Sequence, residues 1–255
     1  MKTLAVIPAR LGATRLPRKP LRLLAGRPLV VRVWERVAAM EVADRCVIAT
    51  DSEEVAAAVR QSGAEAVLTS ATHASGTDRV AEVVRRGEFD GFDAVLNVQG
   101  DEPFIAVGAV RGALGMLDRN FEIGTAAVHA TQGILAEPSV VKVVVADDGR
   151  ALYFSRAPIP FLRESKEQED ATLLRDRVWQ HVGVYAYTPR ALARWVALPT
   201  HPLERIERLE QLRPLAAGTA IGVALVSGPL RRGIDTETDL AQANTEWTIF
   251  SGEPA

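Results

Sequence analysis

The stretch LAVIPARLGATRLPRKP, residues 4–20, joins a short apolar run to a loop rich in cations. The apolar run predicts a buried strand, and the loop carries Arg10, Arg15, Arg18 and Lys19 between prolines. Like charges on a stiff segment repel one another, so a bound polyphosphate would relieve repulsion and accept charge-assisted hydrogen bonds. A solvated basic loop is the alternative. The loop lacks the GxxxxGK[ST] of a Walker motif and the GxGxxG of a dinucleotide site.

Short apolar runs alternate with amphipathic segments through the first half of the chain. This alternation predicts a mainly parallel sheet joined by crossover helices, which is an α/β fold. Beyond the strand at residues 4–7, the pattern predicts strands at residues 46–49, 66–68 and 94–98 and helices at residues 28–40, 52–61 and 78–86. The fold is therefore expected to be a doubly wound, Rossmann-like sheet.

The pattern changes from about residue 123. Two apolar runs at residues 140–145 and 151–154 flank the turn sequence ADDGR, which predicts a hairpin. We expect one domain over residues 1–255, with a smaller mixed or antiparallel β subdomain at about 123–215. Further predicted elements are an exposed connection at 164–177, strands at 178–187 and 221–226, and helices at 202–212 and 239–247. Leu203, Ile206, Leu209 and Leu212 form the apolar stripe of the first of these two helices.

Composition narrows the classes of partner. The 255 residues include 30 basic and 32 acidic side chains, so no net basic field favours nucleic acid, and a small molecule is the expected partner. The single cysteine, Cys46, allows no internal disulfide and lies in an apolar run, where it is expected to be inert. The apolar residues before Pro8 are too few for a signal peptide, and no run approaches the roughly 18 needed to span a bilayer. We expect a cytoplasmic protein.

Acidic residues follow two of the later apolar strands. The segment NVQGDEP, residues 97–103, delivers Asp101 and Glu102 at the end of a strand, and Asp235 follows another apolar run. Each could simply cap a helix. Magnesium, however, needs only one or two carboxylates beside the phosphates of its substrate, and strand ends of a parallel sheet meet at one edge. We therefore predict that Asp101 and Asp235 face the basic loop together.

The sequence resembles the CMP-KDO synthetases, bacterial cytidylyltransferases that activate the acidic sugar KDO for lipopolysaccharide biosynthesis. The resemblance covers nearly the whole chain and rests on nine segments in the family's order and spacing. They are IPARLGATRLPRKPL, ATDSEEV, SGTDRVAEV, NVQGDEP, VKVV, ALYFSRAPIP, HVGVYAY, PLERIERLEQLR and GIDTETDL. The resemblance implies a magnesium-dependent nucleotidyltransferase, commonly a homodimer, that joins CMP from CTP to KDO and releases pyrophosphate.

The resemblance also implies roles for individual residues. The nucleotide would be held by Pro8, Ala9, Arg10, Arg15, Lys19, Arg79 and Gln99, of which Gln99 also reaches the sugar. The other residues of the acid-sugar pocket would be Arg156, His181, Tyr185, Glu210 and Gln211. Asp101 and Asp235 would bind the metal, and together with Arg10 and Lys19 they would form the catalytic group.

Two residues of the basic loop depart from the family pattern. Ala13 stands where the family usually has serine, which removes a hydroxyl donor, and Arg18 stands where it usually has glycine. Arginine adopts positive backbone torsions less readily than glycine, so a different loop path and altered nucleotide affinity are expected.

Taken without the resemblance, several candidates have ordinary structural explanations. His73, His129, His181 and His201 lack the paired spacing of a zinc site. Arg156 could form a surface ion pair, and Glu210 and Gln211 could be the solvated face of a helix. The alternative functions are cytidylyl transfer to another carboxylated acceptor, such as an amino-KDO or a phosphonate, and nucleotide binding without catalysis. A glycosyltransferase is least favoured, because NVQGDEP contains no Asp-x-Asp.

Overall fold

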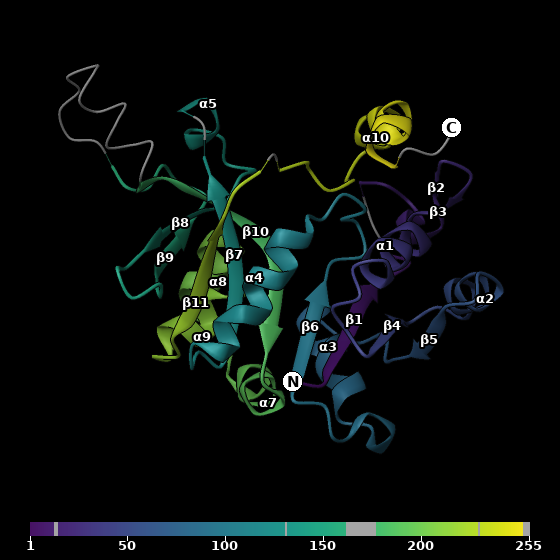
Figure 1. Ribbon diagram of the computed structural model, residues 1–255, viewed down its shortest axis with the longest axis horizontal. Helices are drawn as coiled ribbons and strands as arrows, with labels where there is room; N and C mark the ends of the chain where they lie inside the picture. The colour runs from purple at the N-terminus through teal and green to yellow at the C-terminus, as the bar shows by residue number, and fades with distance from the viewer. Residues whose placement is uncertain (13–14, 131, 162–176, 229, 252–255) are drawn as a thin grey trace. The chain divides into compact units, whose positions relative to one another are not determined.

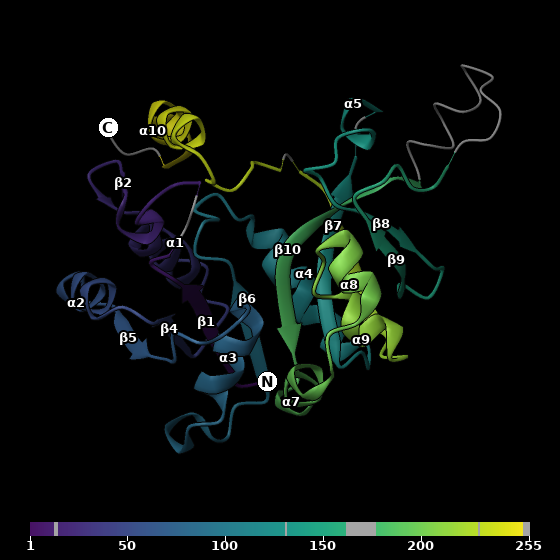
Figure 2. The same ribbon diagram turned by 180° about the vertical axis from the view of Figure 1, so that it is seen from behind.

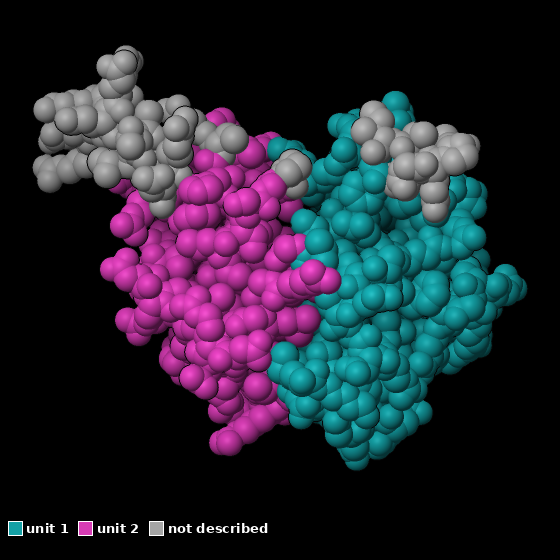
Figure 3. Space-filling model, viewed as in Figure 1, with its two compact units in different colours: residues 1–107, 231–255 teal, residues 108–230 magenta. Residues whose placement is uncertain are grey.

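The computed structural model describes residues 1–12, 15–130, 132–161, 177–228 and 230–251, which form two compact units. Unit 1 comprises Met1–Val107 and Arg231–Ala255, and unit 2 comprises Gly108–Leu230 (Figure 3). Unit 2 begins before and ends after the subdomain predicted at about 123–215. The exposed connection predicted at 164–177 lies outside the described residues, except for Arg177.

Unit 1 is built on a parallel sheet of four strands. Their order is β5 (Glu65–Leu68), β4 (Arg45–Thr50), β1 (Thr3–Ala9) and β6 (Ala94–Val98). Every residue of β1 and of β6 is buried, as expected for strands covered on both faces. All four strands predicted in this half of the chain are thus confirmed.

Crossover helices join the strands of unit 1. They are α1 (Leu29–Ala38), α2 (Glu53–Gln61) and α3 (Gly76–Val84), and the side chains of Ser52 and Ser75 cap α2 and α3. Strand order runs outward from β1 to β4 and β5, and then returns to the other side of β1 at β6. With right-handed crossovers, α3 covers the face opposite α1 and α2 (Figures 1 and 2). The order therefore reverses between β1 and β6.

The C-terminal segment completes unit 1 with α10 (Glu237–Ser251). This helix packs beside the short hairpin of β2 (Leu23–Leu24) and β3 (Arg27–Pro28). A separate apolar core lies here, formed by Leu16, Leu24, Leu29, Phe104, Ile234, Leu240, Ala243 and Trp247. The remaining elements of the unit are the short 3-10 helices η1 (Lys19–Leu21) and η2 (Gly87–Phe89).

Unit 2 contains a mixed sheet. Strand β7 (Ile123–His129) pairs in parallel with β11 (Ile221–Val226) and antiparallel with β10 (Trp179–Tyr187). The predicted hairpin is confirmed as β8 (Lys142–Val145) and β9 (Ala151–Ser155), with β8 also pairing with β10. The helices are α4 (Val107–Asp118), α5 (Gln132–Leu135), α7 (Pro189–Ala197), α8 (Pro202–Glu207) and α9 (Leu212–Ala216).

The single helix predicted over residues 202–212 is wrong. Helix α8 ends at Glu207, because Arg208 adopts a left-handed conformation with φ 54°, and α9 begins only at Leu212. As a result Ile206 leaves the apolar stripe and is 76% exposed. The ion pair between Glu204 and Arg213, with a shortest distance of 2.6 Å, connects the two short helices across the break.

No helix in the described part of the chain combines the length and apolar character that crossing a bilayer requires.

Candidate functional site

The first site lies in unit 1, where the strand order reverses. In open parallel sheets such a reversal leaves a crevice beyond the carboxyl ends of the strands, and ligands bind there. The loop after β1 provides Lys19, and the segment after β6 provides Asp101. The Nζ atom of Lys19 lies 2.5 Å from Asp101 Oδ2 and 2.7 Å from Asp235 Oδ1. The two aspartates are therefore brought together, as the sequence predicted.

Apolar packing brings these three segments to one place. Leu16, in the middle of the cationic loop, is fully buried in the same core as Phe104 and Ile234. Phe104 follows Asp101 closely in sequence, and Ile234 directly precedes Asp235. The Ile234 amide also donates a 2.9 Å hydrogen bond to the Asp101 carbonyl. Each charged side chain is thus fixed by a buried neighbour along its own segment.

Lys19 is the central charge of the site, with a side chain only 13% exposed. Burial alone would lower the pKa of this ammonium, but hydrogen bonds and charge interactions with Asp101 and Asp235 raise it above its usual value. Arg15 is more exposed and contacts Asp235 at 2.9 Å, while Arg10 is exposed at the end of β1. The cations of the loop therefore range from a fixed ammonium to solvent-facing guanidinium groups.

Glu102 differs from its neighbour Asp101. Its carboxylate packs against Gly233, where an added Cβ would lie 2.7 Å from Glu102 Oε1. Burial raises the pKa of Glu102 to about 8, and the negative charge of Asp101 adds to the effect. Glu102 is therefore held as a packing group, while Asp101 points to the charged cluster.

The carboxylate pair fits a magnesium ion. Asp101 Oδ2 and Asp235 Oδ1 both contact Lys19 Nζ, so the two carboxylate oxygens lie close together. Carboxylate oxygens are hard ligands, which magnesium prefers. Among the described residues no group of three or more His, Cys, Asp or Glu side chains could hold a metal by itself. Phosphate oxygens of a ligand would have to complete the coordination.

Arg18 occupies the position where the resemblance expects glycine. It adopts the left-handed conformation, with φ 57° and ψ 31°, and its guanidinium forms an ion pair with Glu54. A non-glycine residue therefore takes up the torsion that glycine would adopt most easily, at a cost on the order of 1 kcal/mol. Ala13, the other departure, lies outside the described residues.

Pro8, Ala9 and Gln99 line the same edge. Gly100 lies so close to the Pro8 carbonyl that an added Cβ would approach its oxygen to 2.8 Å, so the loops after β1 and β6 are in contact. Ala9 is buried, and the side-chain amide of Gln99 donates to Asn97 Oδ1 at 3.3 Å. Gly76, the first residue of α3, packs on the Pro8 ring.

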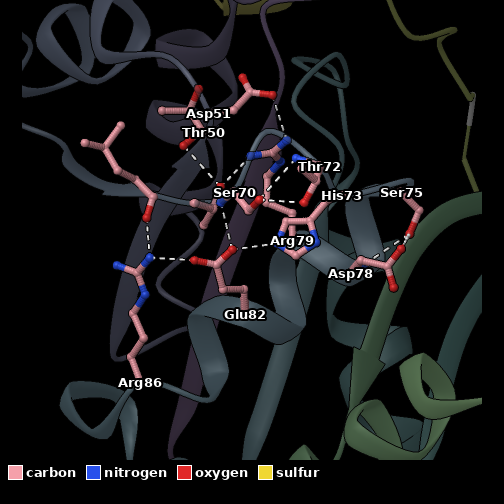
Figure 4. A network of polar contacts seen from close by, with 12 residues as sticks. Thr50, Asp51, Ser70, Thr72, His73, Ser75, Asp78, Arg79, Glu82 and Arg86 are labelled. Atoms are coloured by element: carbon pink, nitrogen blue, oxygen red, sulfur yellow. Dashed lines mark hydrogen bonds and ion pairs between the residues drawn. The ribbon is translucent and has the colours of Figure 1, made fainter.

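Arg79 on α3 is buried, unlike an arginine that binds a ligand at the surface. Its side chain is 3% exposed, and its guanidinium contacts Asp51 Oδ2 at 2.9 Å (Figure 4). The guanidinium also contacts the Thr69 hydroxyl. It belongs to a polar network that also contains Glu82, which accepts hydrogen bonds from Ser70 N and from Arg86. The sequence suggested Asp51 only as a possible cap of the following helix and gave no sign of its contact with Arg79.

A second group of predicted residues lies in unit 2. His181 Nε2 is 2.9 Å from Thr125 Oγ1, and the ring centroids of His181 and Tyr185 are 5.4 Å apart. Burial lowers the pKa of His181 to about 3 and raises that of Tyr185 well above its usual value. The buried Tyr185 hydroxyl has no hydrogen-bond partner among the described residues. Such an atom is available to a ligand.

Arg156 is fixed at the end of β9. Its Nε donates to the Glu207 carbonyl at 2.9 Å and its Nη1 donates to the Pro138 carbonyl at 3.0 Å. Sequence reasoning missed Glu207 and Lys142, which support it: the Glu207 carboxylate accepts the Arg156 amide, and Lys142 Nζ donates to the Arg156 carbonyl at 2.5 Å. The only signal for Lys142 was a lysine within an apolar strand.

The other predicted sugar residues follow α8. Glu210 is half-buried and its charge contributes to the raised pKa of Tyr185, while Gln211 is 6% exposed. Neither is a solvated helix face. Together with His181, Tyr185 and Arg156, these residues belong to unit 2, whereas the whole predicted nucleotide and metal set belongs to unit 1.

The remaining histidines and the cysteine have structural surroundings. His73 contacts Glu82 at 2.6 Å, the tilted rings of His129 and Trp179 have centroids 4.1 Å apart, and the His201 side chain caps α8. Burial raises the pKa of Cys46 to about 12, so its thiol is unreactive.

Comparison with known proteins agrees with this geometry. Residues 4–221 match the cytidylyltransferase family. The 3-deoxy-manno-octulosonate cytidylyltransferase of Gemmatimonas aurantiaca is 59% identical over 251 residues, which cover 98% of this chain and 96% of that protein. The enzyme of the same name from Leptothrix cholodnii is 45% identical over 238 residues, covering 92% of this chain and 88% of that protein.

Two solved structures are similar to this chain. CMP:2-keto-3-deoxy-manno-octonic acid synthetase complexed with CTP has a TM-score of 0.88 at 37% identity, covering 98% of this chain and 99% of that one. The 4-diphosphocytidyl-2C-methyl-D-erythritol synthase of Anaerococcus prevotii, at 14% identity and a TM-score of 0.62, shares the fold alone. The predicted α/β fold with a mainly parallel sheet is confirmed. The chain belongs to the cytidylyltransferase family, and within it to the 3-deoxy-manno-octulosonate cytidylyltransferases, the CMP-KDO synthetases.

Proposed function

We propose that this chain transfers CMP from CTP to KDO and releases pyrophosphate, so that KDO is activated for lipopolysaccharide biosynthesis. The observation that carries the proposal is the position of Lys19 Nζ between the carboxylates of Asp101 and Asp235. A cation and two carboxylates at a sheet reversal form a site for a metal triphosphate. The relatives are named for this reaction and the similar solved structure was complexed with CTP.

The reaction needs little covalent chemistry from the protein. The anomeric hydroxyl oxygen of KDO forms a bond to the α phosphorus, the bond from that phosphorus to the bridging oxygen breaks, and the hydroxyl proton passes to solvent. Lys19, Arg15 and Arg10 neutralise charge that builds on the leaving pyrophosphate. Asp101 and Asp235 would hold magnesium, which supplies polarisation of the phosphate oxygens when bound. Pro8, Ala9 and Gln99 shape the nucleotide edge.

The acceptor is proposed to bind at the residues of unit 2. The Arg156 guanidinium contacts Glu207 and Pro138 through Nε and Nη1, so its Nη2 side can pair with a carboxylate of the sugar. The Tyr185 hydroxyl, which has no hydrogen-bond partner within the described part of the chain, can hydrogen-bond a sugar hydroxyl. His181 is neutral at physiological pH, because burial lowers its pKa to about 3, and therefore acts as a hydrogen-bonding group. Glu210 and Gln211 complete the polar lining.

The working protein is further proposed to be a cytoplasmic homodimer. The single cysteine suits a reducing compartment. The exposed apolar side chains of unit 2, which include Leu152, Phe161, Ile206 and Leu225, suit an interface between copies. Sedimentation velocity at several protein concentrations tests the dimer.

The function is tested by a pyrophosphate-release assay with CTP, magnesium and KDO. Omitting KDO or magnesium in turn should abolish release, and adding EDTA should reproduce the loss of metal. Release with an amino-KDO or a phosphonate in place of KDO, but not with KDO, would assign a different acceptor. Binding of CTP without release under any acceptor would make the chain a nucleotide-binding protein and contradict the proposal.

A further inference from the structure

Asp51 connects two segments of unit 1 at the carboxyl end of β4. Its Oδ1 accepts a 3.3 Å hydrogen bond from the amide of Leu11, which lies in the cationic loop after β1. Its Oδ2 accepts a 2.9 Å hydrogen bond from Arg79 Nη2 on α3. The Asp51 side chain is 16% exposed. The Asp51 carboxylate therefore connects α3 with the loop after β1, which is the loop proposed to hold the triphosphate.

Arg79 in turn fixes Asp51. Its side chain is 3% exposed, and its guanidinium is held by Asp51 through Nη2 (Figure 4). The hydroxyl of Thr69 holds the same guanidinium through Nη1. Thr69 is anchored to the end of β4, because its amide donates to the Thr50 carbonyl at 2.8 Å and its hydroxyl donates to the same oxygen at 3.1 Å. Arg79 is thus held between fixed partners at the ends of β4 and β5.

We propose that Asp51 and Arg79 form a positioning pair for the nucleotide loop, in which Arg79 orients the Asp51 carboxylate and Asp51 holds the Leu11 amide. The inference rests on the proposed function for the role of the loop. Arg79 therefore acts on the nucleotide through Asp51 and does not itself contact it. A buried guanidinium has a high cost unless it is paired, so removing either partner disturbs the other.

The kinetic test uses Asp51→Ala, Arg79→Gln and the double variant. Each single variant should raise KM for CTP about tenfold, the effect of losing one charged hydrogen bond, and leave KM for KDO within about twofold. The double variant should be no worse than Asp51→Ala, because both changes break the same connection. Asp51→Asn, which keeps an acceptor for Leu11, should recover part of the loss.

Glu82→Gln provides the matched control. Glu82 lies on the same helix and in the same network as Arg79, but it holds Ser70, His73 and Arg86 and has no bond to Leu11. Its KM for CTP should stay within about twofold of the wild-type value. A rise as large as that of Asp51→Ala would show general loosening of the network and overturn the positioning pair. A double variant much worse than Asp51→Ala would overturn it as well, because Arg79 would then act directly.

Amide hydrogen exchange at Leu11, followed without any nucleotide, tests the contact independently of turnover. Exchange should be about tenfold faster in Asp51→Ala and in Arg79→Gln than in the wild type and Glu82→Gln. Unchanged exchange in both would overturn the inference. If the wild type released no pyrophosphate while the exchange result held, the proposed function would fail and the Asp51 contact would stand.

Discussion

Lys19 in unit 1 and Lys142 in unit 2 are both largely removed from solvent, yet their surroundings differ. Lys19 is bonded to the carboxylates of Asp101 and Asp235, which are partly exposed. Lys142 is fully buried and donates to three backbone carbonyls, those of Glu137 at 3.0 Å, Val140 at 2.7 Å and Arg156 at 2.5 Å. Burial lowers the pKa of Lys142, whereas the carboxylates raise that of Lys19.

The difference separates a functional charge from a structural one. The partners of Lys19 are charged, partly exposed carboxylates, which can exchange the ammonium for a metal ion and so free Lys19 to pair with a phosphate. The partners of Lys142 are fixed dipoles of the backbone, and all three of its ammonium hydrogens are used, which is the full donor capacity of lysine. Changes around Lys19 should therefore affect turnover, and changes around Lys142 should affect stability.

The largest effect is expected for Asp101→Ala, which breaks the Lys19 cluster. Loss of a group that acts chiefly in the transition state should lower kcat on the order of 100-fold or more, while the free energy of unfolding changes little. Pyrophosphate release at saturating CTP measures it. The control is Glu237→Ala, which removes the exposed partner of Arg22 in the same unit and should keep near-normal kcat. Near-normal turnover of Asp101→Ala would remove Asp101 from the mechanism.

Lys142→Met should have the opposite effect and lower stability more than turnover. It removes a donor from the buried Val140 carbonyl and from the partly buried carbonyls of Glu137 and Arg156, although the Glu137 carbonyl keeps the Val140 amide. Each carbonyl left unsatisfied costs about 1–3 kcal/mol. Because the change also removes the cost of burying an ammonium, a net loss of about 2 kcal/mol in unfolding free energy is expected. Urea denaturation measures it. Lys19→Met is the matched control, and its smaller loss of stability should accompany a much larger loss of turnover. If both variants lost stability equally, the contrast between the two lysines would be wrong.

A smaller effect concerns pH in unit 2. Burial lowers the pKa of His181 to about 3 in the folded protein, against an ordinary value of 6.5, so the unfolded chain binds the proton more readily. The stability that the neutral His181 contributes is fully present above about pH 6.5. It is lost as the pH falls toward 3, at no more than about 1.4 kcal/mol per pH unit. His181→Gln should flatten this slope in urea titrations between pH 6.5 and 5. An unchanged slope would show that other groups cause it.

The smallest effect is expected for Arg18→Gly in the loop beside Lys19. Glycine adopts φ 57° without the steric cost that arginine bears, but the exposed ion pair with Glu54 is lost. Unfolding free energy should change by less than about 1 kcal/mol, in the direction of greater stability, as urea denaturation would detect. Glu54→Gln removes only the ion pair and serves as the control. A clear loss of stability for Arg18→Gly alone would mean that the torsion carries little strain.

Prediction succeeded where a pattern was local. The apolar runs of β6 and β11 coincide with the predicted residues, because continuous apolar runs with clear breaks mark buried strands. The helix over residues 202–212 failed because Arg208 turns left-handed and the pair of Glu204 with Arg213 favours two short helices. Periodicity cannot register such an interruption, since the apolar spacing continues across it.

The sequence by itself determined the alternating α/β pattern, the cationic loop, the two candidate aspartates and the family resemblance. Only the tertiary structure decided that Lys19 joins those aspartates, that Arg79 is held by Asp51, and that Lys142 supports Arg156. The physical reason is that strand and helix signals lie within neighbouring residues. A polar side chain, in contrast, takes its role from partners that the buried core brings together, as Leu16, Phe104 and Ile234 do from three distant segments.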